Sequence, residues 1–164
     1  MSVLGAFLST WDDARATLGA GIPVDGSRFD RGGQLDDLHG TVATATPDAA
    51  WTGTAAQGYS DRNQQLAGNI GRLAELDRRL GAEMDRSAAV VTAGRRDLES
   101  VKQWVMSAAA SVPPNAAGER FLMPVVSKGV AEVADIVARS NSDMNGIAER
   151  IRQIGSDYQA LGDV

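Results

Sequence analysis

Residues that could carry acid–base chemistry are few and scattered along this chain. His39 is the only histidine among the 164 residues. A lone histidine without an acidic or nucleophilic neighbour is typical of a surface or partly packed side chain. The two adjacent acidic pairs, Asp12-Asp13 and Asp36-Asp37, would point about 100° apart on a helix, so their carboxylates would not converge on one substrate atom. These residues predict solvated helix faces and no catalytic site.

Cysteine, metal-ligand and phosphate-loop chemistry is not indicated either. The chain has no cysteine, so a thiol nucleophile, a disulfide and a thiolate metal site are excluded. Its 18 glycines form neither G-x-x-x-x-G-K-S/T nor G-x-G-x-x-G after a strand. The net charge of −5, without a cluster of Lys and Arg, argues against nucleic acid. We therefore predict a protein that is not an enzyme, uses no cofactor or metal and binds no nucleic acid.

The most informative stretch is AAWTGTAAQGYSDRN, residues 49–63, where a Trp-x-Gly triplet separates two helical patterns. Pro47 ends the pattern before it, and no further proline occurs until Pro113. We predict a helical hairpin bent at residues 51–53, with Tyr59 early in the following helix. An indole at such a bend either closes the end of a helical bundle as core or is presented as a recognition element.

Apolar spacing predicts helices on both sides of this bend. Steps of three and four residues predict a first helix over about residues 3–18 and a second from about Arg28 to Ala45. The apolar face of the second helix consists of Leu35, Leu38, Val42 and Ala45. A heptad seam predicts one long helix over residues 54–111, about 85 Å long at 1.5 Å per residue. The seam consists of Tyr59, Leu66, Ile70, Leu73, Leu80, Met84, Val91, Leu98, Val101, Val105 and Ala108.

Pro113-Pro114 predicts a turn over residues 112–124, and a last helix from near Val125 to Leu161 has the most regular repeat. That repeat consists of Val126, Val130, Val133, Val137, Ser140, Met144, Ile147, Ile151, Ile154, Tyr158 and Leu161. The predicted fold is all-α: a single elongated antiparallel bundle or coiled coil of about four helices, with residues 1–47, the bend 48–53, the long helix, the turn and the last helix in order. We expect either a complete protein or the N-terminal part of a longer one.

Polar residues and glycines interrupt the seam of the long helix. We predict that Asp77 and Ser87 are solvated edge positions rather than groups that set the register. Five glycines each cost about 1 kcal/mol of helix propensity relative to alanine. Either they permit close approach of a neighbouring helix, in part from another chain, or a long helix tolerates them. They are Gly58, Gly68, Gly71, Gly81 and Gly94.

The N-terminus and the hydropathy pattern predict neither an exported leader nor a membrane span. MSVLGAFLSTWDDAR has no basic residues before a brief apolar run, and acidic residues follow at once, which excludes an ordinary cleavable signal peptide. Charged residues interrupt every longer apolar stretch, so no transmembrane segment is predicted.

Four strings in fixed order carry a resemblance to a known family. They are LGAGIP at residues 18–23, AWTGTAAQGYSDRN at residues 50–63, LAELDRRL at residues 73–80 and TAGRRDLESVK at residues 92–102. The helix, Trp-x-Gly bend, helix order is similar to the WXG superfamily of type VII secretion. Together the four strings resemble the N-terminal region of the EspA/EspE family of ESX secretion-associated proteins, over roughly residues 15–110.

This resemblance implies a non-enzymatic substrate of a type VII secretion system, secreted or associated with the cell envelope. Its implied partners are the secretion machinery and a small WXG-like or EspC-like co-secreted helical protein. Trp51, Gly53 and Tyr59 are then the secretion or recognition residues. The superfamily places a Tyr-x-x-x-Asp/Glu signal beside the bend. Here the residue four positions after Tyr59 is Asn63, which is not acidic, and Asp163 stands five positions after Tyr158, one place too late. Either Tyr158 and Asp163 are a degenerate signal, or a partner helix supplies the signal, which is the interpretation we favour.

Two other functional classes remain open at this stage. One is a homo-oligomeric structural or membrane-interacting helical effector, and the other is the delivery domain of a larger secreted toxin. An acidic surface makes binding to anionic lipid unfavourable, which weakens the membrane alternative.

Overall fold

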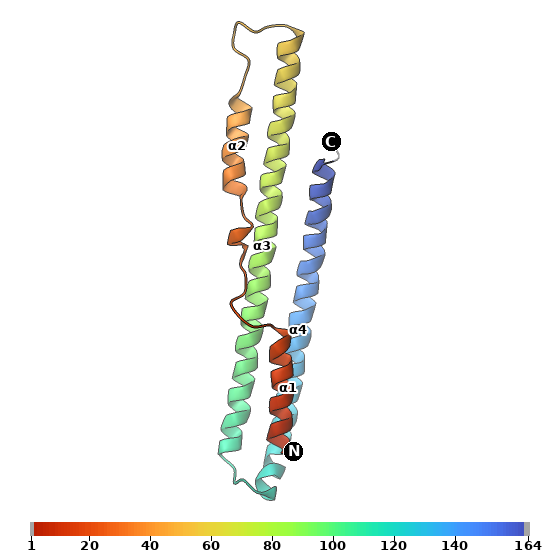
Figure 1. Ribbon diagram of the computed structural model, residues 1–164. Coiled ribbons are helices and arrows are strands. Elements are labelled where there is room, and N and C mark those ends of the chain that lie inside the picture. Colours follow the sequence, from red (N-terminus) through yellow and green to blue (C-terminus); the bar gives the residue numbers. More distant parts are fainter. Residues whose placement is uncertain (1, 163–164) are drawn as a thin grey trace. The chain divides into compact units, whose positions relative to one another are not determined.

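The protein is all-α, as the sequence predicts. The computed structural model describes residues 2–162, and these form four α-helices and one short 3₁₀ helix without any strand (Figure 1). The elements are α1 (Val3–Thr17), the 3₁₀ helix η1 (Gly26–Arg28), α2 (Gly32–Thr44), α3 (Thr54–Ala110) and α4 (Ala116–Gly162). The single long helix predicted over residues 54–111 is confirmed as α3. No helix in the described part of the chain combines the length and apolarity needed to cross a membrane.

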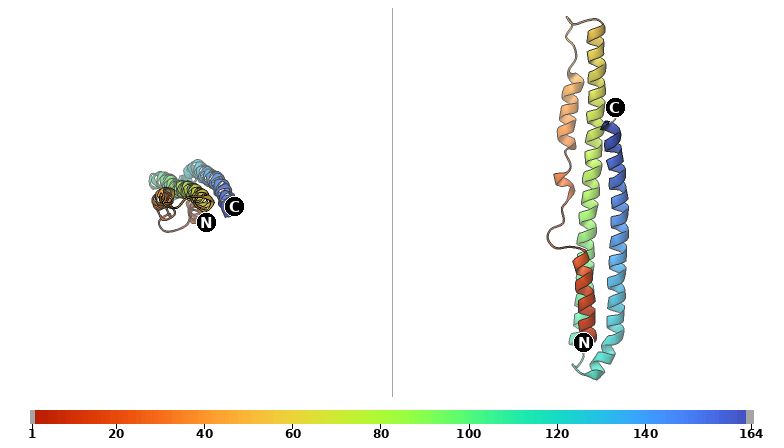
Figure 2. Two further views of the ribbon diagram at one scale, coloured as in Figure 1. Left: turned by 90° about the horizontal axis from the view of Figure 1, so that it is seen from above. Right: turned by 45° about the vertical axis from the view of Figure 1, so that its right-hand side comes forward.

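The helices form two compact units, and α3 and α4 contribute to both. The first unit combines the residues up to Val24 with Arg86–Ile147, and the second combines Asp25–Asp85 with the residues from Ala148 onward. In the first unit, α1 packs against the parts of α3 and α4 that lie beside it, running antiparallel to α3 and parallel to α4 (Figure 2). Its core consists of Phe7, Trp11, Ala14, Leu98, Val105, Val126, Val133 and Ile136.

The contacts of α1 with the other two helices of this unit centre on Trp11 and Phe7. The indole Nε1 of Trp11 donates a buried 2.7 Å hydrogen bond to the carbonyl of Leu98, and Lys102 Nζ lies 3.8 Å from the centroid of the indole. Phe7 is fully buried, and a Cβ at Gly129 would lie 3.0 Å from its ring. The missing side chain at position 129 therefore lets α4 approach α1 closely.

The LGAGIP string forms the loop after α1 and is held by the TAGRRDLESVK string. Gly19 and Gly21 adopt positive φ angles of 69° and 82°, which glycine adopts at least cost. The guanidinium of Arg95 donates to the carbonyls of Leu18, Gly19 and Gly21. The arginine thus satisfies the carbonyl of the C-cap Leu18 and two carbonyls of the loop that follows α1.

The start of α4 differs from the prediction, since it begins at Ala116 and contains Pro124. The Asn115 Oδ1 accepts hydrogen bonds of 3.0 Å from the backbone amides of Ala117 and Gly118, which is an N-terminal cap. Pro124 and Arg120 are exposed, so the Arg120 carbonyl that loses its helical donor can be solvated. The start of α4 is therefore set by the Asn115 cap, and Pro124 is accommodated within the helix.

Gly118→Ala should destabilise the hairpin turn. A Cβ at position 118 would overlap the carbonyl oxygen of Pro113, which is backbone and cannot rotate away. We expect the free energy of unfolding to fall by about 1–3 kcal/mol in urea denaturation. Gly155→Ala is the matched control, because nothing lies within 4 Å of that Cβ position, and it should be neutral or stabilise by up to about 1 kcal/mol. Equal effects of the two substitutions would contradict the packing at the turn.

In the second unit, α2 and η1 lie along residues 54–85 of α3. The elements η1 and α3 lie close together at Gly26 and Gly81, where a Cβ on Gly26 would overlap the Gly81 backbone. Gly26 N also donates a 2.7 Å hydrogen bond to Asp85 Oδ1. Close packing therefore accounts for glycine at position 81, and likewise at position 94, where a Cβ would lie 2.9 Å from the Leu18 side chain. Gly58 and Gly68, in contrast, face open space.

Two predictions for α2 and the α3 seam need correction. The helix α2 begins at Gly32 rather than Arg28, because Asp25 caps η1 instead. Leu38 and Ala45 are exposed, and Ala45 is the C-cap rather than part of the helix. In the α3 seam, Ile70, Leu98 and Val105 are buried, as predicted, but Tyr59 and Leu66 are exposed. The remaining seam residues, Leu73, Leu80, Met84, Val91, Val101 and Ala108, are half-buried. The exposed pair lies at the N-terminal end of α3.

Polar contacts link α3 to α4 in the second unit. The Tyr158 hydroxyl donates to the Asp77 carboxylate, Arg79 pairs with Asp157 at 2.9 Å, and Arg150 pairs with the buried Glu83 at 2.9 Å. The prediction that Asp77 is a solvated edge position is therefore wrong, because a helix partner engages its carboxylate. In the first unit, Ser87 likewise donates to the Met144 sulfur at 3.6 Å.

Tyr158→Phe should lower stability and change its dependence on pH. Burial, and then the hydrogen bond to Asp77, raise the pKa of Tyr158 above its ordinary value of 10.0. A raised pKa in the folded state means that the stability is fully present below pH 10 and is lost as pH rises above it. We expect Tyr158→Phe to cost about 1–2 kcal/mol at pH 7 and to flatten this alkaline loss. Urea denaturation from pH 7 to 11 measures both effects. Tyr59→Phe is the control, and the same flattening there would contradict this assignment.

Candidate recognition site at the Trp51 bend

The bend before α3 is built by local hydrogen bonds and one glycine. Asp48 Oδ1 accepts from the amides of Ala50 at 2.8 Å and Trp51 at 3.1 Å, which closes a turn. Gly53 has a φ of 99°, in the left-handed region, and its carbonyl accepts the first helical hydrogen bond from Gln57. Nothing lies within 4 Å of a Cβ at Gly53, so glycine is favoured at this position by its backbone conformation and not by lack of space for a side chain.

This backbone presents Trp51 at the surface. The indole is 46% exposed and packs against Tyr59, with ring centroids 5.2 Å apart and ring planes at 49°. Tyr59 is itself 40% exposed, so neither ring belongs to the buried core of the second unit. Of the two roles considered for an indole at this bend, closing the core does not describe Trp51. The pair instead forms an apolar surface that also carries an indole N–H and a phenol hydroxyl.

The loop next to this pair is tied to α3. The side-chain amide of Asn63 donates to the carbonyl of Ala45, at the end of α2, and the buried Ala56 lies on the first turn of α3. Asn63 stands four residues after Tyr59, where an acidic residue would complete the expected signal. Its side chain is occupied in holding the loop, so the bend does not supply an acidic group there.

The degenerate signal considered at the C-terminal end does not reach the bend either. Tyr158 is partly buried and donates its hydroxyl to Asp77. Asp163 lies outside the described residues. Tyr158 is therefore a contact between helices and is not presented beside Trp51.

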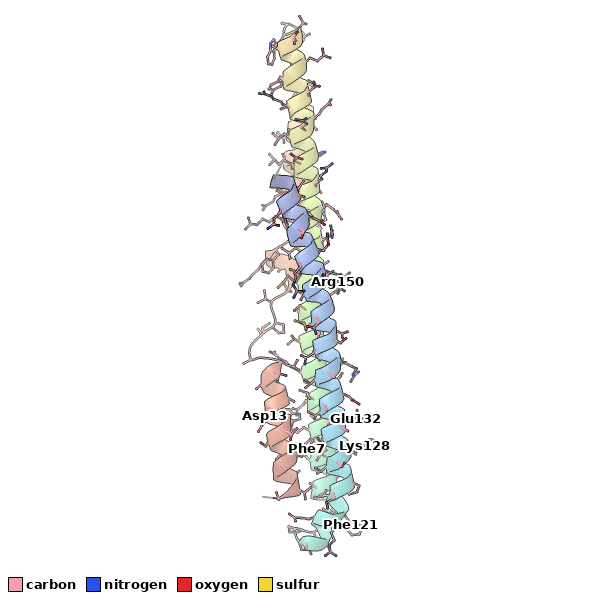
Figure 3. The ribbon with its side chains drawn as sticks, turned by 90° about the vertical axis from the view of Figure 1, so that its right-hand side faces the viewer. Phe7, Asp13, Phe121, Lys128, Glu132 and Arg150 are labelled. Atoms are coloured by element: carbon pink, nitrogen blue, oxygen red, sulfur yellow. The ribbon has the colours of Figure 1, made fainter. Side chains whose placement is uncertain are left out.

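The residues first considered for acid–base chemistry do not assemble a site. His39 is half-buried beside Gly71, and Asp36 pairs with Arg78. Asp12 is exposed, and so is Asp13, which Figure 3 labels on α1. Sequence reasoning missed the ion pair of Asp36, which joins α2 to α3. Among residues 2–162 no group of three or more His, Cys, Asp or Glu side chains is placed to hold a metal.

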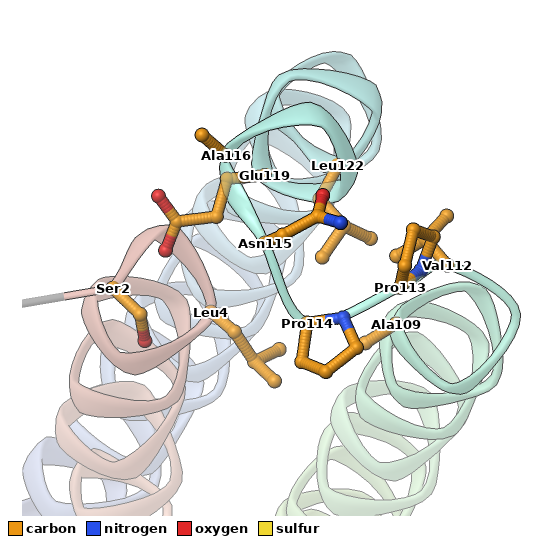
Figure 4. Close-up of a pocket in the computed structure, with 10 residues that line it drawn as sticks. All are labelled: Ser2, Leu4, Ala109, Val112, Pro113, Pro114, Asn115, Ala116, Glu119 and Leu122. Atoms are coloured by element: carbon orange, nitrogen blue, oxygen red, sulfur yellow. The ribbon is translucent and has the colours of Figure 1, made fainter.

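A cavity of about 450 Å³ lies in the first unit, between the start of α1 and the turn from α3 to α4 (Figure 4). Its walls are mainly apolar, and its polar groups are used by the helix ends. Ser2 Oγ accepts from Gly5 N, Asn115 Oδ1 caps α4, and Glu119 is the titratable residue of the lining. A single carboxyl group beside two capping groups forms neither an acid–base pair nor a nucleophile activated by a neighbouring base.

A protein-family match covers much of the chain described above. The model of the EspA/EspE family matches residues 18–100, which is half of the chain and includes the Arg95-held loop and the Trp51 bend. No curated protein and no solved structure matches the chain. The chain belongs to the EspA/EspE family.

Proposed function

We propose that the chain is a non-enzymatic substrate of a type VII (ESX) secretion system, secreted or retained at the cell envelope, and that the bend at Trp51 is recognised during export. Membership of the EspA/EspE family supports the secretion context. The observation that carries the recognition role is the half-exposed indole, which a glycine in the left-handed region and a short turn present together with Tyr59. A large aromatic pair held at the surface is typical of an interaction site.

We further propose that the bend supplies only part of the export signal. Asn63 and Tyr158 are engaged in contacts within the second unit, so the acidic part of a Tyr-x-x-x-Asp/Glu signal has to come from elsewhere. A small WXG-like or EspC-like helical protein exported together with this chain would supply it. Trp51, Gly53 and Tyr59 then contribute the aromatic half of a composite surface.

Export from a producing strain tests this function. The full chain should accumulate in culture filtrate or cell envelope of the parent strain and stay in the cytosol when the ATPase of the secretion system is inactivated. A cytosolic marker protein controls for lysis. Equal export from both strains would contradict the proposal.

Self-association is a second candidate, favoured by exposed apolar side chains at the start of α4. Phe121 is 72% exposed and Met123 is 58% exposed, which is unusual for large apolar residues so close together. Light scattering at rising concentration tests it, because a homo-oligomer should show an increasing mass that Phe121→Glu abolishes. A constant monomeric mass would exclude it.

A further inference from the structure

The helix α4 covers one face of α3 only part of the way along the second unit. Ile154 is buried and Tyr158 reaches Asp77, so this face is closed at that level. Leu161 lines a shallow cavity with Arg72 and Leu76. The described part of α4 therefore covers the α3 seam as far as about Leu73 and Leu76.

The same seam continues uncovered toward the Trp51 bend. Leu66 and Tyr59 precede Leu73 by seven and fourteen residues, and a step of seven residues returns to the same helix face within about 20°. Leu66 is 50% exposed and Tyr59 is 40% exposed, although Leu73 and Leu80 on the same line are half-buried. With Trp51 packed on Tyr59, they form an uncovered apolar stripe, which we call the open seam (Trp51, Tyr59 and Leu66).

We infer that the open seam is the docking surface for an amphipathic helix of a partner protein, lying along α3 in continuation of the line that α4 follows. Continuity with the α3–α4 interface favours a helix as occupant, because apolar positions seven residues apart on a long helix match the heptad spacing of another helix. This inference rests on the proposed function, since it assigns a surface to the small helical partner.

Charge along the seam indicates which helix fits. The positions three residues after Tyr59, Leu66, Leu73 and Leu80 are Arg62, Asn69, Leu76 and Glu83. In the covered part, Glu83 is buried and receives Arg150 of α4 at 2.9 Å. In the open part, Arg62 is exposed, and within residues 2–162 it forms no ion pair. Glu83 of α3 thus faces a residue of opposite charge on the neighbouring helix. Arg62 occupies the equivalent position in the open part, so the partner helix should place an acidic residue opposite it.

Site-specific crosslinking of the full chain in its producing cell tests the inference. Leu66 is replaced by the photoreactive benzoylphenylalanine, and exposed Gln64, which lies about 200° around α3, is replaced in the matched control. We expect a crosslink from position 66 and none from position 64. The crosslinked peptide of the partner should carry apolar residues at heptad spacing and an acidic residue within one turn. Arg62→Glu should reduce partner co-purified with the chain at least tenfold, and changing that acidic residue to Lys should restore it.

Three results would overturn the inference. Crosslinks from position 66 to a second copy of this chain would make the open seam a homodimer surface, and crosslinks to residues beyond 164 of a longer chain would make its occupant intramolecular. Equal crosslinking from positions 64 and 66 would show that the stripe has no preferred partner. Export distinguishes this failure from failure of the proposed function, because a chain that is exported without the crosslink retains its function and loses only the docking surface.

Discussion

Phe7→Ala should lower the free energy of unfolding by about 3–5 kcal/mol, the largest stability effect that we expect from a single substitution. Phe7 is fully buried between α1, α3 and α4 and lies against the gap left by Gly129. Alanine would remove the packing contacts of the phenyl ring and leave a cavity that the long helices cannot close by a small shift. Urea denaturation followed by circular dichroism at 222 nm measures the change.

Phe121→Ala is the control for this prediction. Phe121 is 72% exposed, and Figure 3 labels it near the start of α4, so its removal should change the unfolding free energy by less than about 0.5 kcal/mol. If the two phenylalanine substitutions were equally harmless, α1 would not be packed in the first unit as described.

The predicted fold class and the last helix depend on signals that the sequence carries locally. Heptad steps in α4 predict its buried line correctly, since Val126, Val133, Ser140, Ile147 and Ile154 are buried. Burial follows the repeat because a regular apolar line on a long helix packs along a long neighbouring helix, which here is α3. The proline rule failed at Pro124 because the Asn115 cap and an exposed carbonyl offset the missing donor.

Contacts between distant parts of the chain were less predictable. Periodicity placed Tyr59 and Leu66 on the seam but could not show how far α4 reaches, so their exposure was missed. Nothing in the sequence around Arg95 indicates that its guanidinium donates to the carbonyls of Gly19 and Gly21. The Trp-x-Gly triplet predicted the bend, whereas the exposure of Trp51 depends on the turn formed by Asp48 and required the structure.

Trp51→Ala should reduce export of the chain at least tenfold without destabilising it. The indole is half-exposed and touches Tyr59 in the apolar surface proposed for recognition. A central aromatic anchor of an interface typically contributes at least about 2 kcal/mol of binding free energy, which corresponds to more than a tenfold loss. The melting temperature should change little, because no buried core residue is altered. The ratio of exported to cell-retained protein measures the effect.

The most direct test of the central claim compares that ratio for Trp51→Ala and Trp104→Ala in one secreting strain. Trp104 is 41% exposed, nearly as much as Trp51, but it lies in the first unit, away from the bend in sequence. If recognition depends on the bend, Trp51→Ala stays in the cell while Trp104→Ala is exported like the parent chain, with both variants melting near the parent temperature. Export of a folded Trp51→Ala variant at the parent level would contradict the account.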